Sequence, residues 1–400
     1  MPERLRGLVI TNLFPSNVDP GFAPFNRQQF SALGRLADVE VLGVVPWRYG
    51  RYFGKGKTKD VVDEEIIEGL RVRHPRYTPI PGLSGLNAGL LFAALLPDLA
   101  RRRKSFDVIL GSYAYPDGCA AVLLGQALRC PVVVKCHGSD LNRVTGDHAA
   151  RLQMRKLLPR ASRVIVVSRR LGAAAEELGV DRDRVRLIYN GVDRERFWPM
   201  PREEARKKLV LPPDVEVVVY VGLLAEHKGA RDLLAAIPRL HERRKNVLTV
   251  FVGDGPLLPE VADYVEHRAA ASGAAMAVGR VRHDEVPVWM AAANVLCVPS
   301  WDEGMPNVVR EAHAIGRPVV ATRVGGLPEA VFSEVLGRLV EPHDPGALAE
   351  GLALELAAAA KKTPEEIRRV AVVPSWEESA REVLAVLEEA VGGSGAHSGF

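Results

Sequence analysis

Short apolar runs separated by helical stretches recur along the whole chain and constrain its fold more than any other feature. In the first half these runs are LRGLVIT (5–11), VEVLGVV (39–45), DVILG (107–111), CPVVVKC (130–136) and RVIVVS (163–168). After residue 214 come VEVVVYVG (215–222), VLTVFVG (247–253), AMAVGRV (275–281), NVLCVPS (294–300) and RPVVAT (317–322). Such runs are typical of strands buried on both faces of a parallel sheet. The pattern predicts an α/β chain with two doubly wound, Rossmann-like domains.

Chain length agrees with two domains, since single hydrophobic cores usually stop growing near about 250–300 residues and this chain has 400. The segment NGVDRERFWPMP (190–201) lacks helical or strand periodicity and is typical of a linker. We therefore predict an N-terminal domain over residues 1–195 and a C-terminal domain over 196–374. A helix over 375–391 is expected to pack back on the N-terminal domain, and 392–400 to form a flexible tail.

Composition is that of an ordinary globular protein. The four cysteines form no CxxC pair and are interpreted as reduced core residues. No signal peptide is evident, and the longest apolar stretch, 86–96, falls short of the roughly 20 residues that span a bilayer. We expect a cytoplasmic protein. Residues 1–194 hold 30 Lys/Arg against 19 Asp/Glu, a net charge of +11, whereas the remainder carries −7. The basic half favours an anionic substrate or surface.

The segment WDEGMPNVVREAHAIGRPVVATRVGGLPEAV (301–331) follows a predicted strand directly. Pro306 and Asn307 are good helix-start residues, and the pattern predicts a helix over 308–315. A helix N-terminus at the carboxyl end of a strand suits a diphosphate, because its N–H groups are free. Glu303 and Glu311 on either side would accept hydrogen bonds from hydroxyl groups. The alternative is that both are ordinary solvated surface residues.

Several motifs occur together in a fixed order: FPSNVDPG (14–21), HGSD (137–140), NGVD (190–193), VGLLAEHKG (221–229), VGDGP (252–256), E-x7-E (303–311) and GGLPEAV (325–331). In this order the chain resembles the GT4 family of retaining glycosyltransferases, and is most similar to members that build bacterial cell-surface polysaccharides, teichuronic acid transferases among them. The resemblance implies the GT-B fold, with two Rossmann-like domains facing a central cleft. It also implies transfer of a hexose from a nucleoside diphosphate sugar to a hydroxyl acceptor, a glycan or a lipid-linked molecule.

The resemblance implies roles for residues of the C-terminal domain. Glu303 would hold a hydroxyl of the donor sugar and Glu311 the nucleotide ribose. Lys228, beyond the loop at Gly222, would neutralise charge on the leaving diphosphate. The diphosphate would contact the N–H groups of the loop and helix start, at Gly304, Met305, Pro306, Asn307 and Val308. Without this context, Lys228 would be interpreted as a solvated helix-start residue.

In the N-terminal domain, the resemblance places His137 against the donor sugar near the anomeric carbon, with Asp140 helping to orient it. Gly21 matches a glycine loop that approaches the reacting sugars, although the second position is Phe22. The alternatives are a structural histidine and a plain turn glycine.

The chain departs from the family at Leu223, where an arginine usually binds the diphosphate. Arg231, or the segment Arg280, Val281 and Arg282, are candidates to replace that cation. The D-x-D triplet at 181–183 lies between a helix and a strand and is interpreted as a loop. The resemblance implies that cations and the helix dipole stabilise the diphosphate, so we predict no metal and no other cofactor. The incomplete glycine motif of VGDGP makes NAD binding an unfavoured interpretation.

An apolar stretch at 83–96 precedes the basic cluster 101–104. It is either a buried helix with a solvated basic end or a helix on the anionic inner face of the plasma membrane. No nucleic-acid partner is expected. Two rival functions remain open, a non-hydrolysing sugar-nucleotide epimerase and a non-catalytic sugar-nucleotide-binding subunit. The base, sugar, acceptor, linkage and oligomeric state also stay open.

Overall fold

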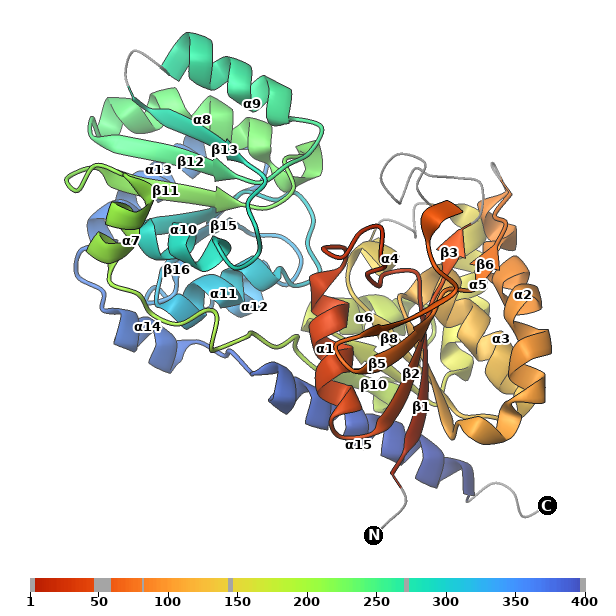
Figure 1. The fold of residues 1–400 in the computed structure, drawn as a ribbon. Coiled ribbons are helices and arrows are strands. Elements are labelled where there is room, and N and C mark those ends of the chain that lie inside the picture. Colours follow the sequence, from red (N-terminus) through yellow and green to blue (C-terminus); the bar gives the residue numbers. More distant parts are fainter. Residues whose placement is uncertain (1–3, 47–58, 81–82, 143–146, 270–272, 396–400) are drawn as a thin grey trace. The chain divides into compact units, whose positions relative to one another are not determined.

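Each series of apolar runs forms one mainly parallel sheet, as the sequence predicts (Figure 1). The structure, a computed structural model, describes residues 4–46, 59–80, 83–142, 147–269 and 273–395. Contacts divide the chain into unit 1, residues 1–191 with 376–400, and unit 2, residues 192–375. The division between the units thus falls four residues before the predicted boundary at 195.

Unit 1 contains an eight-stranded sheet with the order β10-β9-β8-β7-β1-β2-β5-β4. Its strands are β1 (Arg6–Thr11), β2 (Asp38–Gly43), β4 (Glu64–Ile67), β5 (Leu70–Arg73), β7 (Val108–Ser112), β8 (Val132–Cys136), β9 (Arg163–Val166) and β10 (Val185–Leu187). A separate pair joins β3 (Val45–Pro46) and β6 (Arg76–Tyr77). All neighbours pair in parallel except β4 and β5.

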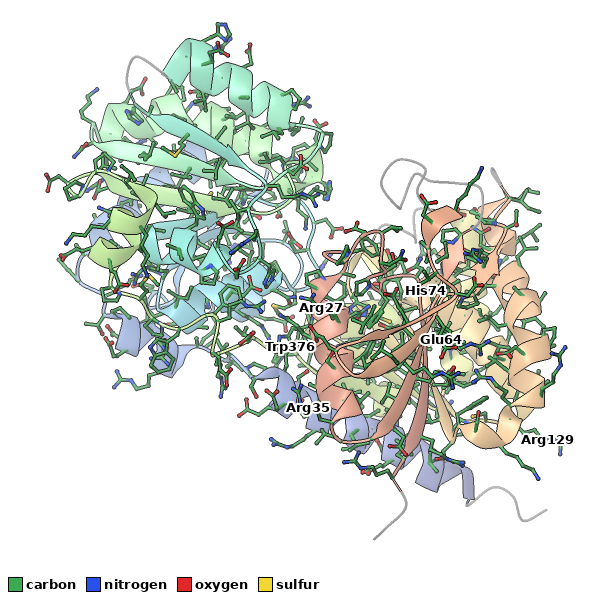
Figure 2. All side chains as sticks on the ribbon, in the orientation of Figure 1. Arg27, Arg35, Glu64, His74, Arg129 and Trp376 are labelled. Carbon is green, nitrogen blue, oxygen red and sulfur yellow. The ribbon has the colours of Figure 1, made fainter. Side chains whose placement is uncertain are left out.

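The helices of unit 1 are α1 (Pro24–Gly34), α2 (Asn87–Arg101), α3 (Cys119–Leu128), α4 (Ser139–Asn142), α5 (His148–Leu157), α6 (Arg169–Glu177) and α15 (Trp376–Gly395). Buried residues of α15 recur at helical spacing, at Trp376, Ala380, Val383 and Leu387, and join the core with Phe30 of α1. Figure 2 labels Trp376 at the start of this helix. The helix continues to Gly395, so residues 392–395 are not the tail that the sequence predicts, and 396–400 lie outside the described residues.

Unit 2 contains a six-stranded, wholly parallel sheet with the order β13-β12-β11-β14-β15-β16. Its strands are β11 (Glu216–Val221), β12 (Val247–Val252), β13 (Ala275–Gly279), β14 (Val295–Val298), β15 (Val319–Thr322) and β16 (Gly337–Val340). Its helices are α7 (Arg202–Leu209), α8 (Ala230–Arg243), α9 (Leu258–Tyr264), α10 (Val286–Ala292), α11 (Asn307–Ile315), α12 (Leu327–Ala330), α13 (Pro345–Ala359) and α14 (Pro364–Val370). The strand order reverses between β11 and β14, so their carboxyl ends form the topological switch point of a doubly wound sheet.

Candidate functional site

A pocket of about 210 Å³ lies at the carboxyl ends of β11 and β14, where open α/β sheets bind ligands. It is lined by residues from the end of β11, the turn before α8, the end of β14 and the start of α11. These are Tyr220, Val221, Gly222, Leu223, Lys228, Cys297, Val298, Ser300, Glu303, Pro306, Asn307 and Val308. Two predicted segments that are far apart in sequence therefore meet at one site: Gly222 with Lys228, and Glu303.

The Glu303 side chain is held in this pocket by two hydrogen bonds, and only 10% of it is exposed. Its Oε1 accepts a hydrogen bond from Nζ of Lys228 at 2.7 Å and another from Oγ of Ser300 at 2.7 Å. The other oxygen, Oε2, accepts no hydrogen bond from the described residues. The contacts fix the carboxylate and leave one acceptor oxygen for a ligand hydroxyl.

Two glycines bring Lys228 and Glu303 together. Gly229 has φ 70°, and a Cβ at this position would lie 1.8 Å from the carbonyl oxygen of Pro299. Gly325 has φ 54°, and its Cβ would lie 1.7 Å from the carbonyl oxygen of Glu303. Only glycine permits both close approaches, so the HKG turn and the GGLPEAV loop pack directly on the end of β14 and on the Glu303 main chain.

One of the diphosphate contacts predicted at the start of α11 is wrong. The helix begins at Asn307 after Pro306, and no side chain caps this N-terminus. Pro306 has no amide proton, so it lines the pocket without donating a hydrogen bond. The candidate donors are the N–H groups of Gly304, Met305, Asn307 and Val308, which precede or begin the helix.

Glu311 lies one turn further along α11. Burial raises its pKa to about 7, while the charge of Arg196 acts in the opposite direction. Its side chain has no hydrogen-bond or ion-pair partner within the described part of the chain. A carboxyl group in this setting gains a partner if a hydroxyl-bearing ligand binds. Glu311 is not among the residues that line the pocket, and its ribose contact stays a prediction.

Leu223 lines the pocket with half of its surface exposed. The three arginines predicted as replacements for the missing cation all have carboxylate partners. Arg231 pairs with Glu226 at 2.8 Å and with Glu260 at 3.0 Å. Arg280 lies 3.4 Å from Asp254, and Arg282 lies 2.7 Å from Asp284. None of these arginines, nor Val281 between the last two, is among the residues that line the pocket.

In unit 1, His137 follows β8 and belongs to a chain of hydrogen bonds. Asn26 donates from Nδ2 to the carbonyl of Leu13 at 2.8 Å, so its Oδ1 faces Ser112, whose hydroxyl donates to it at 3.3 Å. Ser112 Oγ is then the acceptor for Nε2 of His137, 2.9 Å away. Burial and the nearby charge of Lys135 hold the pKa of His137 well below its usual value. The ring is therefore neutral, with its proton on Nε2.

Asp140 orients the main chain at His137 and not its imidazole. Its buried carboxylate accepts hydrogen bonds from the N–H groups of His137 (3.1 Å), Gly138 (2.7 Å), Ala114 (2.9 Å) and Leu141 (3.1 Å). Burial raises the pKa of Asp140, and these hydrogen bonds act against that rise. The sequence prediction that Asp140 supports His137 is thus refined to a main-chain effect.

Gly21 lies in the turn between β1 and α1. A Cβ at this position would meet only Oδ1 of Asp19, at an ordinary 3.9 Å, and the residue does not have a positive φ. This geometry favours the alternative of a plain turn residue.

Lys135, which is fully buried in β8, is a residue that the sequence analysis did not single out. Its Nζ donates to Oε1 of Gln29 at 2.9 Å and to Oδ1 of Asn190 at 3.1 Å, and Ser379 of α15 donates to the same Gln29 oxygen at 3.1 Å. Burial lowers the pKa of Lys135 to about 7. A lysine inside the apolar run VVVKC was the available signal, because such a residue requires polar partners.

The D-x-D triplet lies at a 3-10 turn, Arg182–Arg184, between α6 and β10. Among the described residues, no three His, Cys, Asp or Glu side chains are grouped as metal ligands. Within the same part of the chain, no helix has the length and apolar character needed to cross a membrane.

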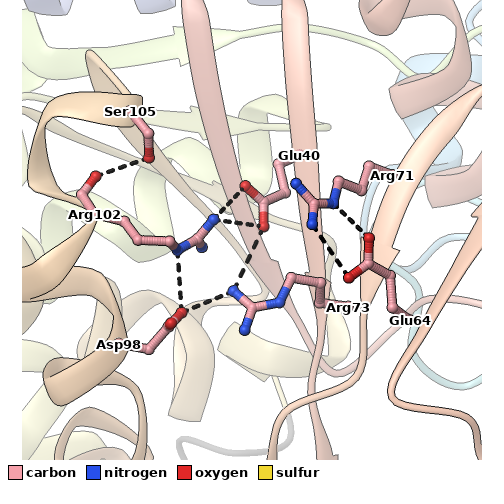
Figure 3. Close-up of polar contacts among 7 residues, drawn as sticks. All are labelled: Glu40, Glu64, Arg71, Arg73, Asp98, Arg102 and Ser105. Atoms are coloured by element: carbon pink, nitrogen blue, oxygen red, sulfur yellow. Dashed lines mark hydrogen bonds and ion pairs between the residues drawn. The ribbon is translucent and has the colours of Figure 1, made fainter.

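The helix α2, which covers most of the apolar stretch 83–96, has its apolar face in the core. Ala88, Leu91, Leu95 and Leu99 of α2 are buried. Figure 3 shows Arg102 bridging Glu40 and Asp98, at 2.9 and 3.2 Å, beside Arg73. Arg103 instead donates to the carbonyl oxygens of Leu128 and Arg129 at the end of α3. Two of the four basic residues at 101–104 thus bond to other parts of unit 1. The structure therefore agrees with the alternative of a buried helix.

Comparisons with known proteins identify the chain's relatives. The family model Glycosyltransferase Family 4 matches residues 35–196, and Glycosyl transferases group 1 matches residues 215–357. The chain is 33% identical to a putative teichuronic acid biosynthesis glycosyltransferase, TuaC, of Bacillus subtilis, over 86% of this chain and 87% of that protein. It is 29% identical to a D-inositol 3-phosphate glycosyltransferase of Salinispora tropica, over 82% of this chain and 74% of that protein.

Solved structures share the fold. The Anabaena protein HepE in complex with UDP matches with a TM-score of 0.72 at 20% identity, over 98% of this chain and 100% of that chain. A sucrose-phosphate synthase of Thermosynechococcus elongatus matches with a TM-score of 0.66 at 24% identity, over 98% of each chain. Together with the two doubly wound units and the motifs, these matches show that the chain belongs to the group 1 and family 4 glycosyltransferases and is a glycosyltransferase with the GT-B fold.

Proposed function

We propose that the protein transfers a hexosyl group from a nucleoside diphosphate sugar to a hydroxyl acceptor, with retention of configuration at the anomeric carbon. The observation that carries this proposal is the meeting of Lys228, Ser300 and Glu303 in the pocket at the start of α11. A fixed cation, a fixed carboxylate and the N–H groups at a helix N-terminus, all at one switch point, suit a diphosphate with hydroxyl groups beside it.

The residues supply electrostatic stabilisation to the leaving group. Lys228 and the N–H groups at the start of α11 face the diphosphate, whose negative charge grows as the glycosidic bond breaks. Glu303 accepts a hydroxyl of the sugar through Oε2, and Glu311 accepts a ribose hydroxyl. The departing phosphate oxygen takes the acceptor's proton on the same face of the sugar, so no covalent intermediate forms. In this scheme the protein supplies the cationic charge and uses no metal.

The relatives suggest which compounds to test first. The related HepE structure contains UDP, so a UDP-sugar is the first donor to examine. The relatives named for teichuronic acid and for D-inositol 3-phosphate suggest an acceptor in cell-surface polysaccharide or glycolipid synthesis.

Two measurements test this proposal. Thermal-shift screening of UDP-, GDP- and ADP-sugars identifies the donor, because a bound ligand raises the melting temperature. Proton NMR of the product with that donor then reports the anomeric configuration. The proposal predicts the same configuration in donor and product. An inverted product contradicts it, and an altered donor with no transfer supports the epimerase alternative.

We further propose that unit 1 contacts the inner face of the plasma membrane through a surface other than α2. Leu83 and Leu86, which flank or lie in the 3-10 turn Ser84–Leu86, are 52% and 50% exposed, and Leu152 of α5 is 48% exposed. Gly85 of this turn packs on Ala149 of α5. The exposed basic residues Arg151, Arg155 and Lys156 share α5 with Leu152. This α5 patch, apolar and basic together, suits an anionic lipid surface.

Sedimentation with vesicles tests the α5 patch. We expect the protein to sediment with phosphatidylglycerol vesicles at low salt and not with phosphatidylcholine vesicles. Charge reversal in Arg151→Glu/Arg155→Glu should abolish this binding, whereas the matched pair Arg101→Glu/Lys104→Glu should leave it unchanged. If only Arg101→Glu/Lys104→Glu abolishes vesicle binding, the membrane contact lies at the basic end of α2 instead. If the wild-type protein does not sediment with the vesicles, the proposed membrane contact is wrong.

A further inference from the structure

A second and larger hollow lies in unit 1, at the amino ends of β8 and β9. Its volume is about 670 Å³, and it is bounded by the end of α3, the segments that lead into these strands, and α15. His137 follows the opposite, carboxyl end of β8. Since β8 has five residues and a strand rises about 3.3 Å per residue, the two edges are roughly 16 Å apart. We call this hollow the amino-edge groove, and it is separate from the predicted catalytic edge.

Positive charge dominates the amino-edge groove. Its charged lining residues are Arg129, Arg160, Arg163, Arg184 and Glu389. The carboxylate is already neutralised, because Oε1 of Glu389 lies 2.8 Å from Arg163 and 2.6 Å from Arg186. These two guanidinium groups lower the pKa of Glu389 to about 2, so it stays ionised and paired at neutral pH. Arg184 pairs with Asp181 at 3.4 Å, so the net positive charge of the groove comes from Arg129 and Arg160.

The groove also has more free donors than free acceptors. Arg129 and Arg160 are exposed, and neither side chain has a hydrogen bond or an ion pair in the described part of the chain. Figure 2 labels Arg129 at the end of α3. Nε of Arg163 is buried without a partner. Oγ of Ser162 accepts a hydrogen bond from the N–H of Val132 at 3.4 Å, and its own proton has no acceptor among the described residues.

From this excess of donors we propose that the amino-edge groove binds a phosphate-bearing small molecule at a second site, distinct from the donor pocket of unit 2. Phosphate oxygens accept hydrogen bonds in the planar geometry that guanidinium groups offer, and such pairs are stronger than neutral ones. The volume falls within the range of small-molecule sites. Because Glu389, Ala390 and Gly393 of α15 form one wall, the ligand would bridge α15 and the sheet.

Titration calorimetry with inorganic phosphate and with pyrophosphate, in buffers matched in ionic strength with NaCl, tests this proposal. We expect saturable binding of at least one of the two anions to the full-length protein. Arg129→Ala/Arg160→Ala should weaken it at least tenfold. The matched pair Arg101→Ala/Lys104→Ala, exposed residues of the same unit that lie outside the groove, should not change it. Both pairs are surface substitutions, and melting temperatures within a few degrees of the wild type would show that they remain folded.

Lys228→Ala separates the two sites, because pyrophosphate also resembles the donor's diphosphate. Binding that survives Lys228→Ala and is lost in Arg129→Ala/Arg160→Ala supports the amino-edge groove. Binding that is lost in Lys228→Ala alone assigns the anion to the donor pocket and overturns the proposal, as does the absence of saturable binding above the NaCl control. Neither result bears on glycosyl transfer, which is measured separately.

Discussion

Lys228 is the residue whose contribution to turnover is easiest to isolate. The Lys228 side chain brings its positive charge into the donor pocket. When Lys228 is replaced, Ser300 still donates its hydrogen bond to Glu303. We predict that Lys228→Ala lowers kcat by roughly 10²–10³-fold, the range for loss of one preorganised stabilising group. Steady-state kinetics with the identified donor measures the effect. Lys208→Ala, on the exposed face of α7, is the control, and equal kinetics in both variants would remove Lys228 from the mechanism.

Leu223 offers a gain-of-function test at the same pocket. It lines the pocket and is half exposed, so an arginine can extend from this position without displacing core atoms. We predict that Leu223→Arg tightens nucleoside diphosphate binding roughly three- to tenfold through a charge-assisted hydrogen bond. Calorimetric titration measures the change, with Leu223→Met as the uncharged control. Unchanged or weaker binding in Leu223→Arg would show that the diphosphate does not approach this position.

His137 has a predicted tautomer that can be read directly. The chain of hydrogen bonds from Leu13 through Asn26 and Ser112 requires a proton on Nε2 and none on Nδ1. Nitrogen-15 NMR of histidine-labelled protein at pH 7 should show this neutral form. Ser112→Ala removes the acceptor and should abolish the preference, while the exposed His148 keeps its signal. A wild-type ring protonated on Nδ1 would contradict the assignment.

At the scale of elements, α15 is held to the sheet of unit 1 by its apolar face and by Glu389. The Glu389 side chain is 37% exposed, so solvent screening limits the effect of its two arginine partners to about 1 kcal/mol. We predict that Glu389→Gln lowers the free energy of unfolding by this amount at pH 7, measured by urea denaturation.

The same pair predicts a pH dependence. Because the folded-state pKa of Glu389 is lowered to about 2, its contribution is complete above the unfolded-state value near about 4.3 and is lost as the pH falls toward 2. The difference between wild type and Glu389→Gln should therefore shrink between pH 5 and pH 3. A difference that stays constant over this interval would mean that the ion pair does not stabilise α15.

Elements buried on both faces were predictable, and half-exposed ones were not. The central strands are near-continuous apolar runs, so their positions follow from the sequence. In the β4–β5 hairpin, β4 alternates exposed and half-buried residues and β5 alternates buried and more exposed ones, with the turn at Glu68 and Gly69. We did not interpret this period-2 signal as strands. Strand β16 (Gly337–Val340) was missed because Gly337 and Arg338 interrupt its apolar run and leave only two consecutive apolar residues.

For the whole molecule, the two doubly wound units were predictable, but the contacts that complete each site were not. The motifs placed Lys228 and Glu303 near one strand edge, as the structure confirms for the edge formed by β11 and β14. The carboxylate partners of Arg231 and Arg280 and the network around Lys135 depend on packing between distant segments, which local sequence patterns do not encode. The predicted N–H contact of Pro306 could have been excluded from the sequence alone, since proline has no N–H.

The central claim is that the switch point of unit 2 binds the nucleoside diphosphate of the donor. Hydrogen–deuterium exchange tests it most directly, with the nucleoside diphosphate that raises the melting temperature most. We predict slower exchange of the segments 222–228 and 303–311 when the nucleotide is bound, and a smaller effect in Lys228→Ala at the same nucleotide concentration. Saturating nucleotide that leaves both segments unchanged, while protecting residues elsewhere, would contradict it.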